Sequence, residues 1–291
     1  MAFRYATGER VDQYRRPRTS PDVQAAIRSV DVEGLVAADE WELLGALGYA
    51  VDFARYWQPP DEEDIRYAAP EVVALLEPIA GVLLRHPVCA WWDDPVDLAL
   101  QRVIAYPFGN EALPESALPY RSERVRWDEW RAHVEAGEAR SGREYERNPH
   151  RTFSDEWWST PYAAGTVQTT RARPGLGALQ LIAEEDTSIG DEARVCTVSV
   201  SEFARVYEIA APADCARLVD RYPLEVTASR RWDWYNTIGR HRRWFMPDWR
   251  AVAADLDAVH VSVNGYLTSA GIEIPLQERD GATVLAGWAR T

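Results

Sequence analysis

The chain has no lysine, and all 32 of its basic residues are arginine. Without lysine there is no Schiff-base residue for pyridoxal phosphate, no phosphate-binding P-loop lysine and no kinase strand lysine. Recognition of anions by side chains therefore depends on arginine, whose planar guanidinium group fits carboxylates and phosphates.

Cysteine and histidine are also sparse. The three cysteines, Cys89, Cys196 and Cys215, are too widely spaced for a disulfide framework or a zinc knuckle, so we expect free, buried thiols. None of the five histidines has metal-binding spacing such as HExxH; they are His86, His133, His150, His241 and His260. The sequence therefore predicts no metal site and identifies no cofactor.

Long apolar runs are missing, and residues 1–18 lack the apolar segment of a secretory signal. The net charge of −14 opposes binding to nucleic acid or to an anionic membrane, and it suits a basic protein partner. With 46% hydrophobic residues, the chain has enough apolar side chains for a folded core. We expect a soluble, cytoplasmic, acidic protein that binds neither nucleic acid nor membrane.

Two common catalytic or nucleotide-binding motifs are also missing. There is no GxGxxG dinucleotide loop, because Gly175-Leu-Gly177 is only a short turn, and there is no GxSxG nucleophile elbow. A catalytic triad assembled from distant residues, with His260 as its base, stays open.

The apolar pattern changes near Asn148-Pro149. Residues 1–148 follow helical periodicity, whereas residues 149–291 contain short segments of partial alternation, such as the one around Leu179 and Leu181. We predict an α+β fold, in which a helical N-terminal half and a mixed β-sheet C-terminal half pack together as one unit.

The same patterns predict individual elements. Expected helices cover residues 41–55 and 72–83, a short stretch from Asp94-Pro95 through Ile104, and residues 212–222 and 247–256; the charged stretch 121–151 is a helix or a linker. Expected strands cover residues 206–209, 258–263 and 283–288.

Arginines and tryptophans are interleaved in the segment Ser229 to Trp244, SRRWDWYNTIGRHRRW, where five arginines and one aspartate give a charge of +4. Guanidinium groups bind anions and indoles stack on planar rings, so this block predicts a site for an anionic, ring-bearing small molecule. Strand alternation would place Arg230 with Trp232, and Arg231 with Asp233. Alternatively, the tryptophans are core residues and the arginines pair with carboxylates. The candidate ligand-binding residues are Arg230, Arg231, Trp232, Trp234 and Tyr235.

The segment Ala258 to Val263 alternates cleanly between apolar and polar residues. His260 and Ser262 are therefore expected on one strand face, opposite the valines, and we expect His260 to face a cleft. We predict His260 or Asp233 as the general acid or base, since imidazole changes its charge near neutral pH.

A second polar stretch is WWSTP at 157–161, followed by Thr169 to Arg171 and Glu184 to Asp186. It either contributes to a polar site or forms a structural turn before the proline. Arg151, Ser159-Thr160 and Glu185 stand in an order that suits ADP-ribosyl transfer from NAD, which makes such an enzyme a less favoured alternative.

Two C-terminal segments carry a resemblance. The run PDWRAVAADLDAVHVSVNGYLTSAG from Pro247 to Gly271, together with LAGW at 285–288, resembles a group of uncharacterised actinobacterial proteins. YPLEVTASRRWDWY, from Tyr222 to Tyr235, and WWDDPVDLALQ at 91–101 are similar to the same group. Because this group has no assigned reaction, the resemblance implies no catalytic residue.

Two functions follow from these patterns. The first is an enzyme with a pocket between the helical and β-rich halves, acting on an anionic, ring-bearing molecule. The second is an acidic, non-catalytic module of the immunity or antitoxin kind, which binds a basic protein through its charge and its 13 tryptophans. A closed pocket favours the first function, and a flat acidic face with exposed tryptophans favours the second.

Overall fold

The computed structural model describes residues 20–53, 59–106, 126–152, 157–161, 166–183 and 192–286. Its N-terminal helices are α2 (Ser20–Arg28), α3 (Val32–Ala37), α4 (Glu40–Phe53), α5 (Glu62–Tyr67) and α6 (Pro70–Leu83), followed by the 3-10 turns η1 (Pro87–Asp93) and η2 (Leu98–Leu100). Pro70 occupies the first turn of α6, where its missing N–H leaves no helical hydrogen bond unmade.

The predicted charged segment forms one long helix, α7 (Trp127–Arg147), which buries Val134, Ser141 and Tyr145 along one face. The remaining helical elements are η3 (Leu179–Leu181), α8 (Pro212–Arg221), α9 (Arg231–Ile238), α10 (Trp249–Asp255) and α11 (Val263–Ser269). The strands are β1 (Gln101–Ala105), β2 (Thr170–Arg173), β3 (Gly177–Ala178), β4 (Arg194–Thr197), β5 (Val206–Ile209), β6 (Pro223–Glu225), β7 (Arg243–Pro247), β8 (Ala258–Val261), β9 (Glu273–Pro275) and β10 (Ala282–Leu285).

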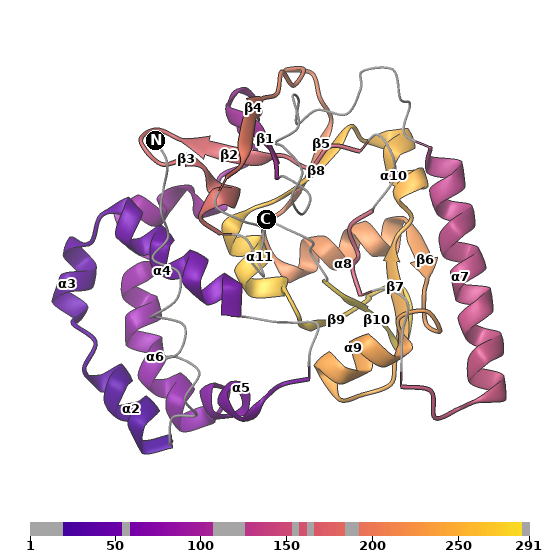
Figure 1. The fold of residues 1–291 in the computed structure, drawn as a ribbon, viewed down its shortest axis with the longest axis horizontal. Helices are drawn as coiled ribbons and strands as arrows, with labels where there is room; N and C mark the ends of the chain where they lie inside the picture. Colours follow the sequence, from indigo (N-terminus) through magenta and orange to yellow (C-terminus); the bar gives the residue numbers. More distant parts are fainter. Residues whose placement is uncertain are drawn as a thin grey trace.

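The described strands form three sheets. One has the order β3-β2-β1-β4 and is antiparallel throughout. The second has the order β6-β7-β10-β9, with β7 and β10 parallel, and the third is the parallel pair β5-β8. Figure 1 shows the N-terminal helices on one side, α7 on the other and the sheets between them. The predicted α+β class is confirmed, with helices dominating the first half and most strands in the second.

One large cluster of buried apolar residues holds the C-terminal half together. Trp234 and Trp244 are fully buried in it, and their rings meet edge to face with centroids 5.3 Å apart. Val51 from α4 and Val134 from α7 belong to the same cluster, so the helical half packs directly on the β-rich half. A separate, smaller cluster joins α2 to α6.

Two local predictions outside the arginine–tryptophan block are wrong. The expected helix from Asp94-Pro95 through Ile104 is instead η2 followed by β1, which pairs with β2 and β4. Both partner strands come much later in the chain, so no local pattern reveals them. Residues Leu179–Leu181 form a 3-10 turn in place of the expected extended segment.

The cysteines match the expectation of free thiols. Cys89 and Cys215 are buried and Cys196 is half-buried, and none of the three forms a disulfide. Burial raises the pKa of the Cys215 thiol to about 12, which keeps it protonated and unreactive.

Within the described residues, no single helix is both long and apolar enough to cross a membrane. The bent pair α6 and η1, whose axes differ by 96°, reaches that length and composition only when the two are taken together.

Gly265 lies where α11 approaches β5, and a side chain there meets backbone. A Cβ at residue 265 would lie 2.1 Å from the carbonyl oxygen of Ile209 and 3.0 Å from its carbonyl carbon. Because backbone atoms cannot rotate away, we expect Gly265→Ala to lower the free energy of unfolding by about 1–3 kcal/mol.

The matched control is Gly142→Ala in α7, where a new Cβ meets nothing within 4 Å. It should raise the free energy of unfolding by about 0.5–1 kcal/mol, since alanine favours helix. Urea unfolding measures both variants, and a Gly265→Ala variant as stable as the parent would contradict the close approach.

Candidate functional site

A cavity of about 720 Å³ lies between the N-terminal helices and the β-rich half. Residues of α4, η1, β1 and β2 form one part of its wall, and residues of β5, β8, α10 and α11 form the other. Most lining side chains are apolar, among them Leu44, Leu47, Trp249 and Tyr266. Its size and lining are those of a pocket for a small molecule.

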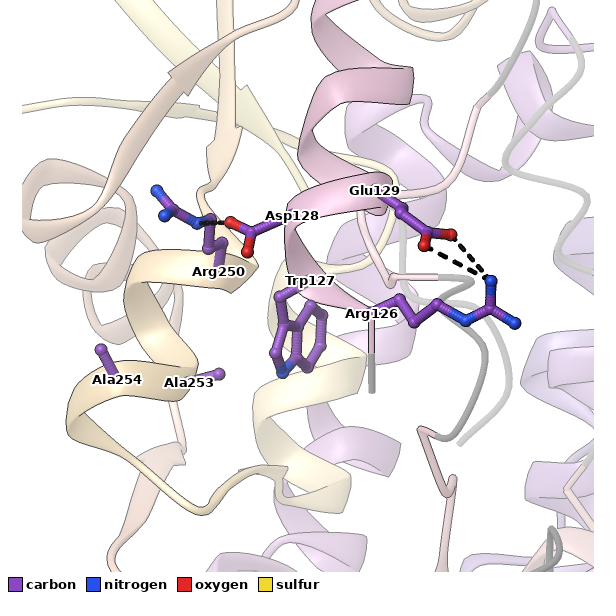
Figure 2. Close-up of a pocket in the computed structure, with 7 residues that line it drawn as sticks. All are labelled: Arg126, Trp127, Asp128, Glu129, Arg250, Ala253 and Ala254. Carbon is purple, nitrogen blue, oxygen red and sulfur yellow. Dashed lines mark hydrogen bonds and ion pairs between the residues drawn. The ribbon is translucent and has the colours of Figure 1, made fainter. Parts of the chain in front are cut away.

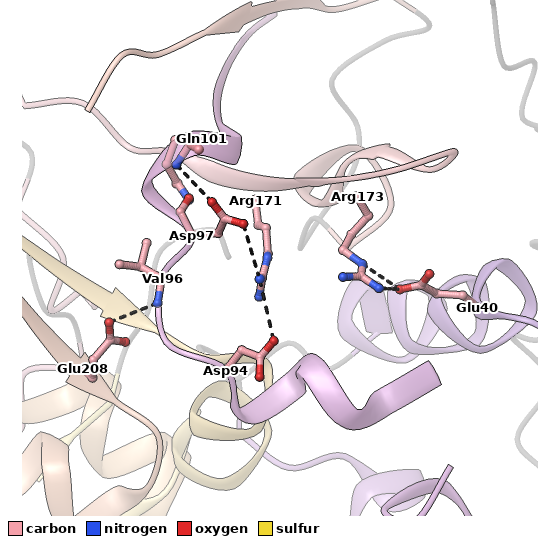
Figure 3. Close-up of polar contacts among 9 residues, drawn as sticks. Glu40, Asp94, Val96, Asp97, Gln101, Arg171, Arg173 and Glu208 are labelled. Carbon is pink, nitrogen blue, oxygen red and sulfur yellow. Dashed lines mark hydrogen bonds and ion pairs between the residues drawn. The ribbon is translucent and has the colours of Figure 1, made fainter. Parts of the chain in front are cut away.

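His260 lies on the wall of this cavity, and its ring is paired with a carboxylate. The Nδ1 atom of His260 lies 2.5 Å from Oε2 of Glu208, and the backbone N–H of Val96 donates to Oε1 of Glu208 at 3.1 Å. Figure 3 shows the contact between Val96 and Glu208. Because a carboxylate accepts hydrogen bonds, Nδ1 carries the proton and Nε2 is the ring nitrogen left for a ligand.

The strand register places this pair. β5 and β8 run parallel, with Glu208 directly opposite His260. Val259 and Val261 pack in part against the main core, and both line the cavity together with His260. Ser262 follows at the end of β8, where its hydroxyl accepts from the N–H of Gly265 and caps α11.

An ion pair fixes the start of both strands. Arg205 donates to the Asp257 carboxylate from its backbone N–H at 2.8 Å and from its guanidinium Nε at 3.0 Å, and the Asp257 N–H donates to the Arg205 carbonyl at 2.9 Å. Asp257 directly precedes β8, the strand that contains His260, and it also lines the cavity. The pair therefore helps to set the register that brings Glu208 opposite His260.

The opposite wall carries the other polar side chains. Arg171 and Asp94 both line the cavity, and Figure 3 shows Arg171 between Asp94 and Asp97. The Nη2 atom of Arg171 lies 3.7 Å from Asp94 and 3.8 Å from Asp97, which is beyond hydrogen-bond distance. The neighbouring Arg173 instead binds Glu40 of α4, with Nε to Oε1 at 2.8 Å.

The first part of the arginine–tryptophan block is helical, so the strand alternation that we expected for residues 230–233 is wrong. α9 covers Arg231–Ile238 and ends at Gly239, whose φ of 73° is the left-handed conformation of a helix cap. Helical spacing buries Trp234 and leaves Trp232 and Tyr235 half-buried.

The predicted ligand-binding residues of this block do not line either of the two cavities described here. Arg230 is buried, and its guanidinium donates to the Trp158 carbonyl at 3.4 Å. The guanidinium of Arg231 stacks on the Tyr145 ring at 4.6 Å. Trp234 donates from Nε1 to the Trp157 carbonyl at 2.7 Å. These contacts are structural, and a ligand-binding role for the block stays a prediction.

Asp233, the second predicted acid or base, lies on α9, away from His260 on β8 (Figure 1). Its backbone carbonyl accepts from the Thr237 hydroxyl at 3.1 Å. The structure therefore does not bring the two predicted catalytic residues together.

The WWSTP stretch is built into the core. The Ser159 hydroxyl donates to the Leu285 carbonyl at 2.9 Å, and the Ser159 carbonyl accepts from Nε1 of Trp249 at 2.7 Å. Thr160 lines the cavity. Glu184 to Asp186 lie outside the described residues.

A second, open hollow of about 440 Å³ lies between α7 and α10. Figure 2 shows its charged groups bound to one another, with Arg250 on Asp128 and Arg126 on Glu129. Since these charges already have partners, the hollow offers a ligand less than the large cavity does.

No cluster of three or more His, Cys, Asp or Glu side chains that could hold a metal ion occurs among the residues that the structure describes. Comparisons of the chain with models of protein families, with curated proteins and with solved structures find no match. The case for function therefore depends on the cavity and the groups in its wall.

Sequence reasoning found His260 but missed its partner Glu208. A signal was present, because Glu208 is the one charged residue in the strand Val206–Ile209, and His260 is the one polar residue in the strand Ala258–Val261. A lone ionisable residue in the middle of each of two apolar strands favours cross-strand pairing.

The Asp257–Arg205 pair makes a pH-dependent contribution to stability. Arg205 holds the pKa of Asp257 at about 2 through hydrogen bonds from its guanidinium and its backbone N–H. A carboxyl whose pKa is lowered on folding stabilises the protein above its ordinary pKa of about 4, and that contribution is lost as the pH falls towards about 2.

We expect Asp257→Asn to lower the free energy of unfolding modestly at pH 7, because the pair is exposed. The difference from the parent should shrink as the pH falls from about 4 to about 2. Denaturant unfolding across this range measures it. Arg205→Gln should give the same profile, and a difference that is constant with pH would exclude the pair as its cause.

Proposed function

We propose that this chain is an enzyme that holds a small, mainly apolar molecule in the cavity and transfers a proton on it, with His260 as the general acid and base. The observation that carries the proposal is the pair of His260 and Glu208 on the wall of a cavity with largely apolar lining. An imidazole oriented by a carboxylate, beside a space of ligand size, is the arrangement that proton transfer needs.

In this mechanism Glu208 is a positioning residue. Its carboxylate holds Nδ1–H of His260, while the Val96 N–H holds the second carboxylate oxygen. Nε2 then accepts a proton from the bound molecule and returns it at another atom or to the same one. The developing imidazolium charge is stabilised by Glu208, and the apolar walls keep water from competing for the proton.

The alternative of an acidic module that binds a basic protein has less support. Its hot spots would be exposed tryptophans, but among the tryptophans that the structure describes only Trp41, at 42% exposure, is on the surface. The remaining described tryptophans are buried or half-buried. The cavity between the two halves instead supports the enzyme.

An ADP-ribosyltransferase is also not favoured. Arg151 pairs with Glu144, and the buried Ser159 hydroxyl donates a hydrogen bond to the Leu285 carbonyl. Glu185 lies outside the described residues. The cytoplasmic location and the kinship with the actinobacterial group remain part of the proposal and add no reaction to it.

A simple ketone tests the proton transfer. In D₂O, 4-phenylbutan-2-one gains deuterium at the carbons beside its carbonyl, and NMR measures the rate. We expect the parent protein to accelerate this exchange, and His260→Gln to lower the accelerated rate by about 100-fold or more. Glu208→Gln should cause a smaller loss, because the imidazole remains but is no longer held.

The control variant is His133→Gln, which changes an exposed histidine on α7 and should leave the rate unchanged. Saturation-transfer NMR on the same samples reports whether the ketone binds. A parent protein that binds the ketone but exchanges its protons at the buffer rate would rule out proton transfer on a molecule of this kind.

A further inference from the structure

We propose that Arg171 and Trp91 form an anion subsite in the wall of the large cavity, and that the natural ligand is a monocarboxylic acid with an apolar body. This inference rests on the proposed cavity function, whose substrate class it names. It does not depend on proton transfer by His260, so the two are separable by experiment.

The first observation is a pair of buried donors. Within the described residues, Nε of Arg171 and Nε1 of Trp91 have no hydrogen-bond partner, although both side chains line the cavity. Trp91 is 8% exposed, so its N–H is removed from bulk water. A buried N–H without an acceptor is destabilising, and the destabilisation disappears when a ligand oxygen accepts from it.

The neighbouring polar groups of the same wall differ from these two. The Thr169 hydroxyl donates to Oε1 of Gln101 at 2.8 Å, and Nε2 of Gln101 donates to the Asp97 carbonyl at 2.7 Å. The Thr170 hydroxyl accepts from the N–H of Gln180 at 3.1 Å. Because these polar groups hydrogen-bond to one another or to the backbone, they need no ligand. Among the described residues of this wall, the N–H groups that lack an acceptor are Nε of Arg171 and Nε1 of Trp91.

The two arginines of β2 show the same contrast. Arg171 and Arg173 both stack on the Trp91 ring, with guanidinium carbons 5.6 and 4.7 Å from its centroid. The Arg173 guanidinium donates to the Glu40 carboxylate, with Nη2 to Oε1 at 2.7 Å. Among the described residues, the carboxylates near Arg171 are those of Asp94 and Asp97, at the longer distances given above (Figure 3). Stacking therefore holds Arg171 in place without using its N–H groups.

The local charge selects a monoanion. Asp94 and Asp97 flank Arg171 and would repel the second negative charge of a phosphate monoester, whereas a carboxylate carries one charge and two oxygens for two donors. The remaining wall, with Leu44, Leu47 and Tyr266, suits an aliphatic or aromatic body.

Two probes that differ only in the head group test the subsite: 4-phenylbutanoate and 4-phenylbutan-1-ol, with Kd measured by titration calorimetry at low salt. The parent should bind the acid about tenfold more tightly than the alcohol, because only the acid places a charged acceptor on Arg171. Arg171→Gln should remove this preference through weaker acid binding, with little change for the alcohol.

Trp91→Phe keeps a ring and removes one N–H, so it should reduce the preference in part. The matched control is Arg173→Gln, which removes the other stacked arginine of β2 and should keep the preference. The subsite is overturned if the parent binds both probes equally, if Arg171→Gln keeps the preference, or if neither probe binds.

Comparison with the ketone experiment separates the two proposals. An acid preference that depends on Arg171, without accelerated deuterium exchange, supports the subsite and contradicts proton transfer. Accelerated exchange that depends on His260 supports proton transfer. If the Arg171→Gln variant then binds the acid as tightly as the parent does, the subsite is contradicted.

Discussion

The parallel pairing of β5 with β8 is the contact on which the site depends. It sets Glu208 opposite His260, in a strand whose valines contact the main core and line the cavity together with His260. A slip of one residue would move His260 away from Glu208 and turn every side chain of the strand to the other face of the pair. The Asp257–Arg205 pair at the start of the strands and the tight fit of α11 against β5 both oppose such a slip.

The absence of lysine gives the structure a particular electrostatic character. Many arginines of the described chain form ion pairs with carboxylates, as Arg205 does with Asp257 and Arg173 with Glu40. Much of the positive charge is therefore neutralised locally. Density of arginine in the sequence is therefore a poor guide to anion binding here. The informative property is a buried guanidinium N–H that has no partner among the described residues, such as Nε of Arg171, and only the packed structure identifies it.

The sequence predicts the elements whose signals are local. Apolar periodicity and proline position identify α6 and α8, and alternation identifies β8. β1 was mistaken for helix, because its strand identity depends on hydrogen bonds to distant strands.

α9 was mistaken for a strand because short aromatic-rich segments fit both periods, and burial of Trp234 in the core decides between them. Composition alone favours the arginine–tryptophan block over Arg171 as an anion site. The block is conspicuous in composition, whereas Arg171 is one residue of an ordinary strand.

The uneven distribution of buried apolar residues has a consequence for local opening of the fold. The contact between α2 and α6 has a buried cluster of only Val23, Ile27 and Val72, while the β-rich half shares the large cluster. Layers with few buried contacts open at lower free energy than the global core, by local unfolding that amide hydrogen exchange detects. The contact between α2 and α6 is thus expected to exchange its amide hydrogens faster than the paired strands that hold Glu208 and His260. Because no described residue of α2 or α6 lines the cavity, this opening leaves the described cavity wall in place.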